Sequence, residues 1–250
     1  TIRSYKKKNF MINKEQINEL SKFFQIDGFT ILREYLQLMF LSYLYREKEA
    51  TSIYFKGGTA IRLLFNSPRF SEDLDFSTKF SKSEIKKIIQ NLERSMQKEL
   101  PGLKITHLYT GKRGMRFRLK YQSVDFKYPL VIRLDFHLIK KSGKIIVSPI
   151  VTKFPIVIFP MVSHLSISEI LAEKISALIN RAMGRDFFDV WYLLEKGIEV
   201  DWKLTDRTSV LKRIKRVSQK KLQLDLSQFL PKSQRSIVGI LKEKLEERLA

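Results

Sequence analysis

The sequence predicts an α/β protein in which a mixed sheet with flanking helices is followed by a mainly helical lobe. Residues 52–65 change from a β-prone run to helical spacing across two glycines, and residues 104–147 alternate apolar and polar side chains like strands. From about residue 165, apolar side chains recur every three or four positions, as in amphipathic helices. We therefore expect a sheet-containing unit at 1–164 and a helical lobe at 165–250, with a cleft between them.

Composition limits the possible classes of function. The chain has 250 residues, 44% of them hydrophobic, which is enough for a sizeable core. It has no Cys, which excludes disulfides, zinc–thiolate sites and cysteine nucleophiles. The net charge of +21 favours a polyanionic partner, nucleic acid before an anionic membrane. The apolar stretches at 36–45 and 154–162 are too short to span a bilayer, and the N-terminus lacks the apolar region of a signal peptide, so we expect a soluble cytoplasmic protein.

The N-terminal third is expected to be helical before the first strand. Residues 1–10 are basic and suit a loose arm, and residues 11–24 and 29–45 have helical spacing. The second of these helices is apolar over much of its surface. It should therefore pack against the sheet.

A turn at Gly57 and Gly58 joins the strand at 52–55 to the helix at 59–65. Glycines let the backbone approach an anion, and the first N–H groups of a helix lack intrahelical partners, so such a turn suits phosphate. An ordinary tight turn with no ligand explains the same residues.

Asp73 and Asp75 lie two positions apart in an alternating run at 73–77, so in a strand their carboxylates share one face. Two carboxylates this close raise each other's pKa unless a cation lies between them. Mg²⁺ is the natural occupant, because it prefers oxygen ligands and fills its remaining positions with water and phosphate oxygens. The alternative is an exposed edge strand protected by charges.

The two segments together resemble the signature of the polymerase-β-like nucleotidyltransferase superfamily, with Asp73 fifteen residues after Gly58. Within it, the sequence is similar to the AbiEii/AbiGii abortive-infection toxin family. The similarity rests on Phe55-Lys56-Gly57-Gly58-Thr59-Ala60, Arg69-x-Ser71-x-Asp73-Leu74-Asp75-Phe76, Glu169 to Lys174, Arg181, Arg185-Asp186, Asp189 and Trp191. It implies the polymerase-β-like fold and a nucleotide site that includes Lys56, Gly57, Gly58, Thr59, Arg69 and Ser71.

A third carboxylate is expected from a neighbouring strand. After a helix that Ser81 or Ser83 caps, residues 104–110, 114–121 and 128–138 have strand alternation, and 144–147 suits a fourth. Asp135 fits the third carboxylate by resemblance, as a Mg²⁺ ligand or as the base that activates the attacking hydroxyl. Its alternative role is a salt bridge to Arg133 or a neighbour. The basic residues near the hairpin tip, Arg116 among them, suit either phosphate contacts or a solvated surface.

The helical lobe is expected to complete the site. Ser168 is the predicted N-cap of a helix at 169–181, whose apolar side carries Lys174; that side chain either extends to solvent or enters the nucleotide cleft. The resemblance favours the cleft and pairs Lys174 with Asp189, fifteen residues later, with Arg185 as a phosphate ligand. Asp186 suits an N-cap of the next helix. The basic segment at 203–221 suits a helix with either an RNA-guiding or a solvated face.

The resemblance implies a Mg²⁺-dependent nucleotidyltransferase that moves a nucleotide from an NTP to an RNA acceptor, with the 3′ end of tRNA foremost. It also implies a toxin of a toxin–antitoxin, abortive-infection system, with a cognate antitoxin as partner. The surplus positive charge agrees with tRNA. Two alternatives stay open: transfer of a nucleotide or phosphate to a protein hydroxyl, and a non-catalytic RNA-binding module.

Overall fold

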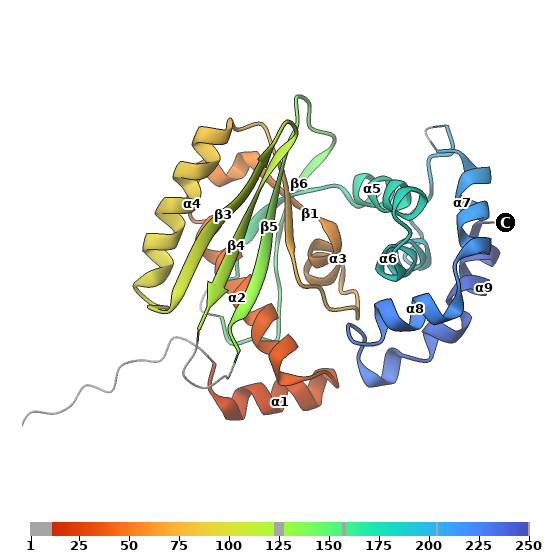
Figure 1. The fold of residues 1–250 in the computed structure, drawn as a ribbon, viewed down its shortest axis with the longest axis horizontal. Coiled ribbons are helices and arrows are strands. Elements are labelled where there is room, and N and C mark those ends of the chain that lie inside the picture. Colours follow the sequence, from red (N-terminus) through yellow and green to blue (C-terminus); the bar gives the residue numbers. More distant parts are fainter. Residues whose placement is uncertain (1–11, 123–127, 157–158, 204, 250) are drawn as a thin grey trace, which may run out of the picture.

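The computed structural model describes residues 12–122, 128–156, 159–203 and 205–249 (Figure 1). The predicted basic arm at 1–10 lies outside this part of the chain. Within it, no helix combines the length and the apolar character needed to cross a bilayer.

The described strands form one mixed sheet in the order β3-β4-β5-β2-β1-β7-β6. The β2–β5 and β1–β7 pairs are parallel, and the other pairs are antiparallel. Strand β2, with both of its edges paired, lies at the centre, so the alternative of an exposed edge strand for Asp73 and Asp75 is wrong. The strands are β1 Ile53–Lys56, β2 Leu74–Thr78, β3 Leu103–Gly111, β4 Gly114–Tyr121, β5 Leu130–Leu138, β6 Ile145–Pro149 and β7 Met161–Leu165.

Helices from the N-terminal part of the chain cover the sheet. Helices α2 and α4 lie against one side of it and α3 lies on the other, next to α5 and α6 (Figure 1). Ser81, and not Ser83, caps α4, in a capping box with Glu84. Aromatic rings fill the centre of the core, where Phe76 and Phe136 stack with centroids 5.0 Å apart. These helices are α1 Lys14–Phe24, α2 Gly28–Leu44, α3 Gly57–Phe65 and α4 Lys82–Gln97, with a short 3-10 turn at Lys48–Ser52.

The described chain beyond β7 is helical, and α5 and α6 lie between α3 and the outer helices (Figure 1). Hydrogen bonds join this region to the sheet unit; among them, the Tyr192 hydroxyl donates to the Phe65 carbonyl at 2.7 Å, and the Phe70 N–H donates to the Phe229 carbonyl at 2.8 Å. That residues 165–250 form a separate lobe stays a prediction. The helices are α5 Ile167–Asn180, α6 Gly184–Glu195, α7 Arg207–Arg216, α8 Gln219–Leu226 and α9 Ile237–Leu249, with a short 3-10 turn at Lys232–Gln234.

Two local predictions were wrong. Ser166, and not Ser168, caps α5, because Glu169 then occupies the third helical position, where its N–H reaches the serine hydroxyl. Helix α6 begins at Gly184, which puts Asp186 inside the first turn and not at the cap. In addition, no strand was predicted at residues 161–165, where β7 pairs with both β1 and β6.

Candidate active site

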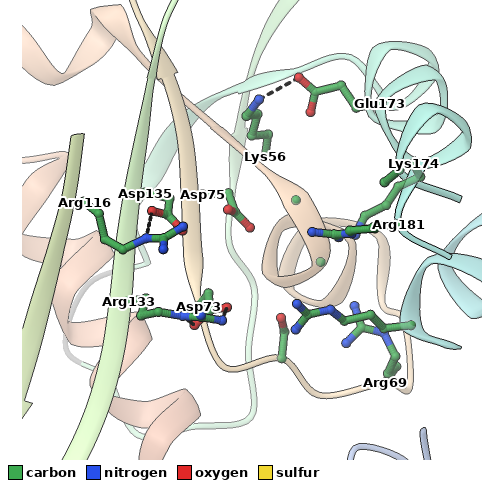
Figure 2. Close-up of a pocket in the computed structure, with 15 residues that line it drawn as sticks. Lys56, Arg69, Asp73, Asp75, Arg116, Arg133, Asp135, Glu173, Lys174 and Arg181 are labelled. Carbon is green, nitrogen blue, oxygen red and sulfur yellow. Dashed lines mark hydrogen bonds and ion pairs between the residues drawn. The ribbon is translucent and has the colours of Figure 1, made fainter. Parts of the chain in front are cut away.

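A cavity of about 260 Å³ lies where the sheet faces α5 and α6. The carboxylates on β5, on β2 and in the loop before β2 form one wall, and basic side chains from the helices form the other (Figure 2). Both predicted halves of the site therefore meet. The lining residues are Lys56, Gly57, Gly58, Arg69, Ser71, Asp73, Asp75, Arg116, Arg133, Asp135, Glu173, Lys174, Ala177, Arg181 and Arg185.

The glycine turn forms the floor of this cavity. Gly57 has φ of 78°, and a Cβ there would lie 2.3 Å from the Asp75 Oδ2 atom. A Cβ at Gly58 would lie 2.3 Å from a guanidinium nitrogen of Arg69. Helix α3 starts at this point with no side chain capping it, so its first N–H groups lack a side-chain acceptor and suit an anion.

Two of the three carboxylates are held by arginines from neighbouring strands. The register of β2 and β5 places Asp75 beside Asp135. Arg116 donates from Nε to Asp135 at 2.6 Å, and Arg133 donates from Nε to Asp73 at 2.9 Å (Figure 2). Asp135 therefore pairs with a neighbour, one of the two alternatives that the sequence left open, and it also lines the cavity.

Asp75 is the carboxylate whose ionisation is most disturbed. Its pKa is raised to about 6, first by burial and then by the negative charges of Asp73 and Asp135, with Lys174 and Lys56 acting in the opposite direction. A carboxylate in this position is stabilised by any cation that comes close to it.

The donor set fits Mg²⁺ in kind. Asp73, Asp75 and Asp135 supply oxygen ligands along one wall, which is the chemistry that Mg²⁺ prefers. In the described part of the chain, however, no three carboxylate or histidine side chains stand close enough to hold an ion as they are. Arg116 and Arg133 pair with Asp135 and Asp73, so an ion bound by these carboxylates would compete with both arginines. The metal assignment stays a prediction.

On the helical side, a buried ion network fixes two cations. Arg69 donates from Nε and from a terminal nitrogen to both Asp189 oxygens, at 2.7 and 2.8 Å, and the Lys174 Nζ lies 2.7 Å from Asp189. Burial favours the neutral acid at Asp189, but Arg69 and Lys174 outweigh it and hold its pKa below the usual value. Asp189 is fully buried and does not line the cavity. It positions Arg69 and Lys174, which do.

The other helical cations differ in how they are paired. Arg181 donates to both oxygens of the buried Asp186, at 2.8 and 2.7 Å. Arg185 lines the cavity with no carboxylate partner among the described residues, and its buried Nε makes no hydrogen bond there. On the sheet side, Lys56 pairs with Glu173 at 2.6 Å. Arg185 is thus the guanidinium most available to an anion.

Two predicted nucleotide ligands have different positions. Ser71 lines the cavity, and its carbonyl accepts a hydrogen bond of 3.1 Å from Gln37 on α2. Thr59 is buried outside the lining, and its hydroxyl donates to the Asp73 carbonyl. Thr59 therefore fastens α3 to the carboxylate loop.

The sequence did not assign Glu173, Arg133 or Arg116 to the site. Glu173 directly precedes Lys174, and Arg133 alternates with Asp135, so their positions carried a signal. Arg116 reaches Asp135 only through the β4–β5 register, which no local pattern reveals.

Several solved structures share the fold at 18% sequence identity. MenT4, a nucleotidyltransferase toxin from Mycobacterium tuberculosis, aligns with a TM-score of 0.60 over 96% of this chain and 89% of its own. JHP933 from Helicobacter pylori aligns with a TM-score of 0.55, over 90% and 94% of the two chains. A putative nucleotidyltransferase from H. pylori aligns with a TM-score of 0.53, over 95% and 97%. No curated protein matches the sequence.

The sequence itself matches a family over residues 40–243, which includes the glycine turn, the carboxylates and the helical cations. That family is described as the nucleotidyl transferase AbiEii toxin of type IV toxin–antitoxin systems. The chain is therefore a nucleotidyltransferase that belongs to the AbiEii toxin family.

Proposed function

We propose that this nucleotidyltransferase transfers a nucleotide from an NTP to an RNA acceptor, foremost the 3′ end of tRNA, in a Mg²⁺-dependent reaction. The supporting observation is the opposition of two walls across one cavity. Three carboxylates, Asp73, Asp75 and Asp135, face the basic side chains of α5 and α6 (Figure 2). This is the distribution of charge that a triphosphate and a divalent ion together require.

The helical wall binds the triphosphate. Lys174 and Arg185 neutralise the charge that develops on the leaving pyrophosphate, and Asp189 keeps Lys174 in place. The amides of the Gly57–Gly58 turn hold further phosphate oxygens. Asp73, Asp75 and Asp135 would hold Mg²⁺, which supplies Lewis-acid polarisation of the phosphate oxygens when bound.

The transfer forms one bond and breaks another. The acceptor hydroxyl oxygen bonds to the α-phosphorus while the bond from that phosphorus to the bridging oxygen of the β-phosphate breaks, which releases pyrophosphate. Asp135 takes the hydroxyl proton where it acts as the base and not as the third metal ligand. No covalent enzyme intermediate is needed, because positioning and charge stabilisation carry the reaction.

The net charge of +21 and the family support the acceptor and the biological role. A strongly cationic protein attracts RNA backbones in a salt-dependent manner. We place the chain as the toxin of an abortive-infection pair in the cytoplasm, controlled by a cognate antitoxin.

Expression of the toxin alone should arrest the growth of cells, and co-expression with the protein encoded by the adjacent gene should restore it. Growth arrest that no neighbouring protein relieves would contradict this role.

Incubation with each α-³²P-labelled NTP, Mg²⁺ and total tRNA tests the reaction, beside an Asp73→Ala control. We expect label in tRNA with one preferred NTP, and no label in the variant or in EDTA. Label in protein would indicate a protein hydroxyl as acceptor. Mg²⁺-dependent NTP binding should also be lost in the variant, whereas RNA binding without any NTP binding would indicate a non-catalytic module.

A further inference from the structure

A second cavity, of about 370 Å³, adjoins the first on the side of the β3–β4 hairpin. The two share Lys56, Asp75, Arg116 and Asp135, so the carboxylates lie between them. Nothing from α5 or α6 lines the second cavity. Its other lining residues are Phe76, Tyr109, Gly111, Arg113, Gly114, Met115, Phe136 and His137.

Tyr109 is an aromatic side chain that the fold leaves open to solvent. It is 61% exposed, and an irregularity in the β3–β4 register occurs between His107 and Tyr109. A Cβ at Gly111 would lie 2.2 Å from the tyrosine Oη atom, so the ring packs closely over this glycine. A Cβ at Gly114 would lie 2.5 Å from the Phe136 carbonyl oxygen. Both glycines keep the floor of the cavity free of side chains. Such a platform suits the stacking of a nucleobase.

The charges around this platform suit a phosphate backbone. Lys56, Arg113 and Arg116 line the cavity, and the exposed side of β4 continues from Arg116 with Arg118 and Lys120. Alternate residues of a strand share one face, so these cations form a continuous row. A cationic row beside an exposed aromatic ring is typical of sites for single-stranded nucleic acid.

The two cavities also have the relative position that an in-line transfer needs. The attacking hydroxyl and the leaving pyrophosphate lie on opposite sides of the α-phosphorus. With the triphosphate at the helical wall, the hydroxyl must approach from the side of Asp75 and Asp135 that faces the second cavity.

We propose that the second cavity is the acceptor subsite, which binds the terminal nucleotide of a single-stranded RNA 3′ end. The terminal base stacks on Tyr109, and a backbone phosphate contacts Arg113. The strand then leaves along the row of Arg118 and Lys120. This inference rests on the proposed transfer to RNA, and it names where the acceptor lies.

Steady-state transfer to tRNA with separate KM values for NTP and for tRNA tests the subsite. Tyr109→Ala should raise the KM for tRNA about tenfold and leave the KM for NTP unchanged, whereas Tyr109→Phe should stay close to the wild type. Arg113→Gln should raise the same KM and weaken its salt dependence, by about 0.7 in the log–log slope. Arg94→Gln, on α4 at the covered side of the sheet, removes the same charge and should change neither value (Figure 1).

A wild-type KM for tRNA in both Tyr109→Ala and Arg113→Gln would overturn the subsite while the proposed function stands. If the wild type transfers nothing to RNA, the proposed function fails, and the subsite is decided by binding. Fluorescence anisotropy with a short single-stranded RNA that has a free 3′ hydroxyl is then the readout. Affinity about tenfold weaker in Tyr109→Ala than in Arg94→Gln supports an RNA site here. Equal affinities, or no binding, overturn it.

Discussion

Asp75→Asn should make the protein more stable while it abolishes nucleotide transfer. Asp75 is a carboxylate with a pKa raised to about 6, first by burial and then by Asp73 and Asp135. The folded state therefore prefers the protonated acid, and ionisation costs stability as the pH rises from the unfolded-state pKa, near 3.8, through about 6. One pKa unit corresponds to ~1.4 kcal/mol, so the full cost above pH 6 is ~3 kcal/mol. Asparagine has nearly the same shape and carries no charge.

Thermal unfolding in EDTA at two pH values measures this effect. For a chain of this length, ~1 kcal/mol shifts the melting temperature by about 2 °C. We expect Asp75→Asn to melt about 6 °C above the wild type at pH 7.5 and about 2 °C above it at pH 4.5, where part of the cost has already disappeared. Asp225→Asn is the matched control, because Asp225 is not among the charges that act on Asp75. It breaks a partly exposed pair with Lys221 and should bring no gain.

A melting temperature of Asp75→Asn at or below that of the wild type at pH 7.5 would refute the reasoning. A gain of equal size at both pH values would refute it as well, because it would have a cause other than ionisation. The predicted pH-dependent gain would mean that the ionised Asp75 carboxylate destabilises the folded protein and is kept at a position where a cation is needed.

Three further substitutions test the remaining parts of the site. Asp189→Asn leaves Arg69 and Lys174 buried without a full counter-charge, so the free energy of unfolding should fall by about 3–5 kcal/mol in urea titrations; an unchanged value would mean that the network is not structural. Arg185→Ala removes a guanidinium that lacks a carboxylate partner among the described residues, so the KM for NTP should rise about tenfold at an unchanged melting temperature. A KM for NTP equal to that of the wild type would show that Arg185 does not bind the nucleotide. Gly57→Ala places a Cβ 2.3 Å from a carboxylate oxygen at a φ of 78°, so calorimetry should find weaker NTP binding and a stability loss of ~1–3 kcal/mol. An NTP affinity equal to that of the wild type would argue against phosphate binding at the Gly57–Gly58 turn.

Local patterns predicted the parts of the fold whose signals lie within a few residues. The strand–turn–helix around Gly57 and the hairpin around Gly111 lie where alternation and glycines placed them. No strand was predicted at residues 161–165, where the structure has β7. Its hydrogen bonds go to β1 and β6, which the sequence of residues 161–165 does not reveal.

In the candidate site, too, local patterns predicted some positions, whereas contacts between distant segments could not be predicted. Asp75, Asp135 and Lys174 line the cavity from their own strands and helix, and Asp73 lines it from the loop directly before β2, so their positions follow from local structure; their roles stay predictions. The pairing of Arg69 with Asp189 joins residues 120 positions apart. It could not be predicted, because it depends on how α6 packs against the loop before β2. The same holds for Arg116, which reaches Asp135 across a strand register.

Parallel reactions with α-³²P- and γ-³²P-labelled forms of the preferred NTP test the central claim most directly. Nucleotidyl transfer predicts that the α-label enters tRNA at the 3′ end, while the γ-label appears only in released pyrophosphate. Both signals should require Mg²⁺ and the Asp73 carboxylate. A γ-label in RNA or protein would contradict nucleotidyl transfer, and an α-label confined to protein would contradict RNA as the acceptor.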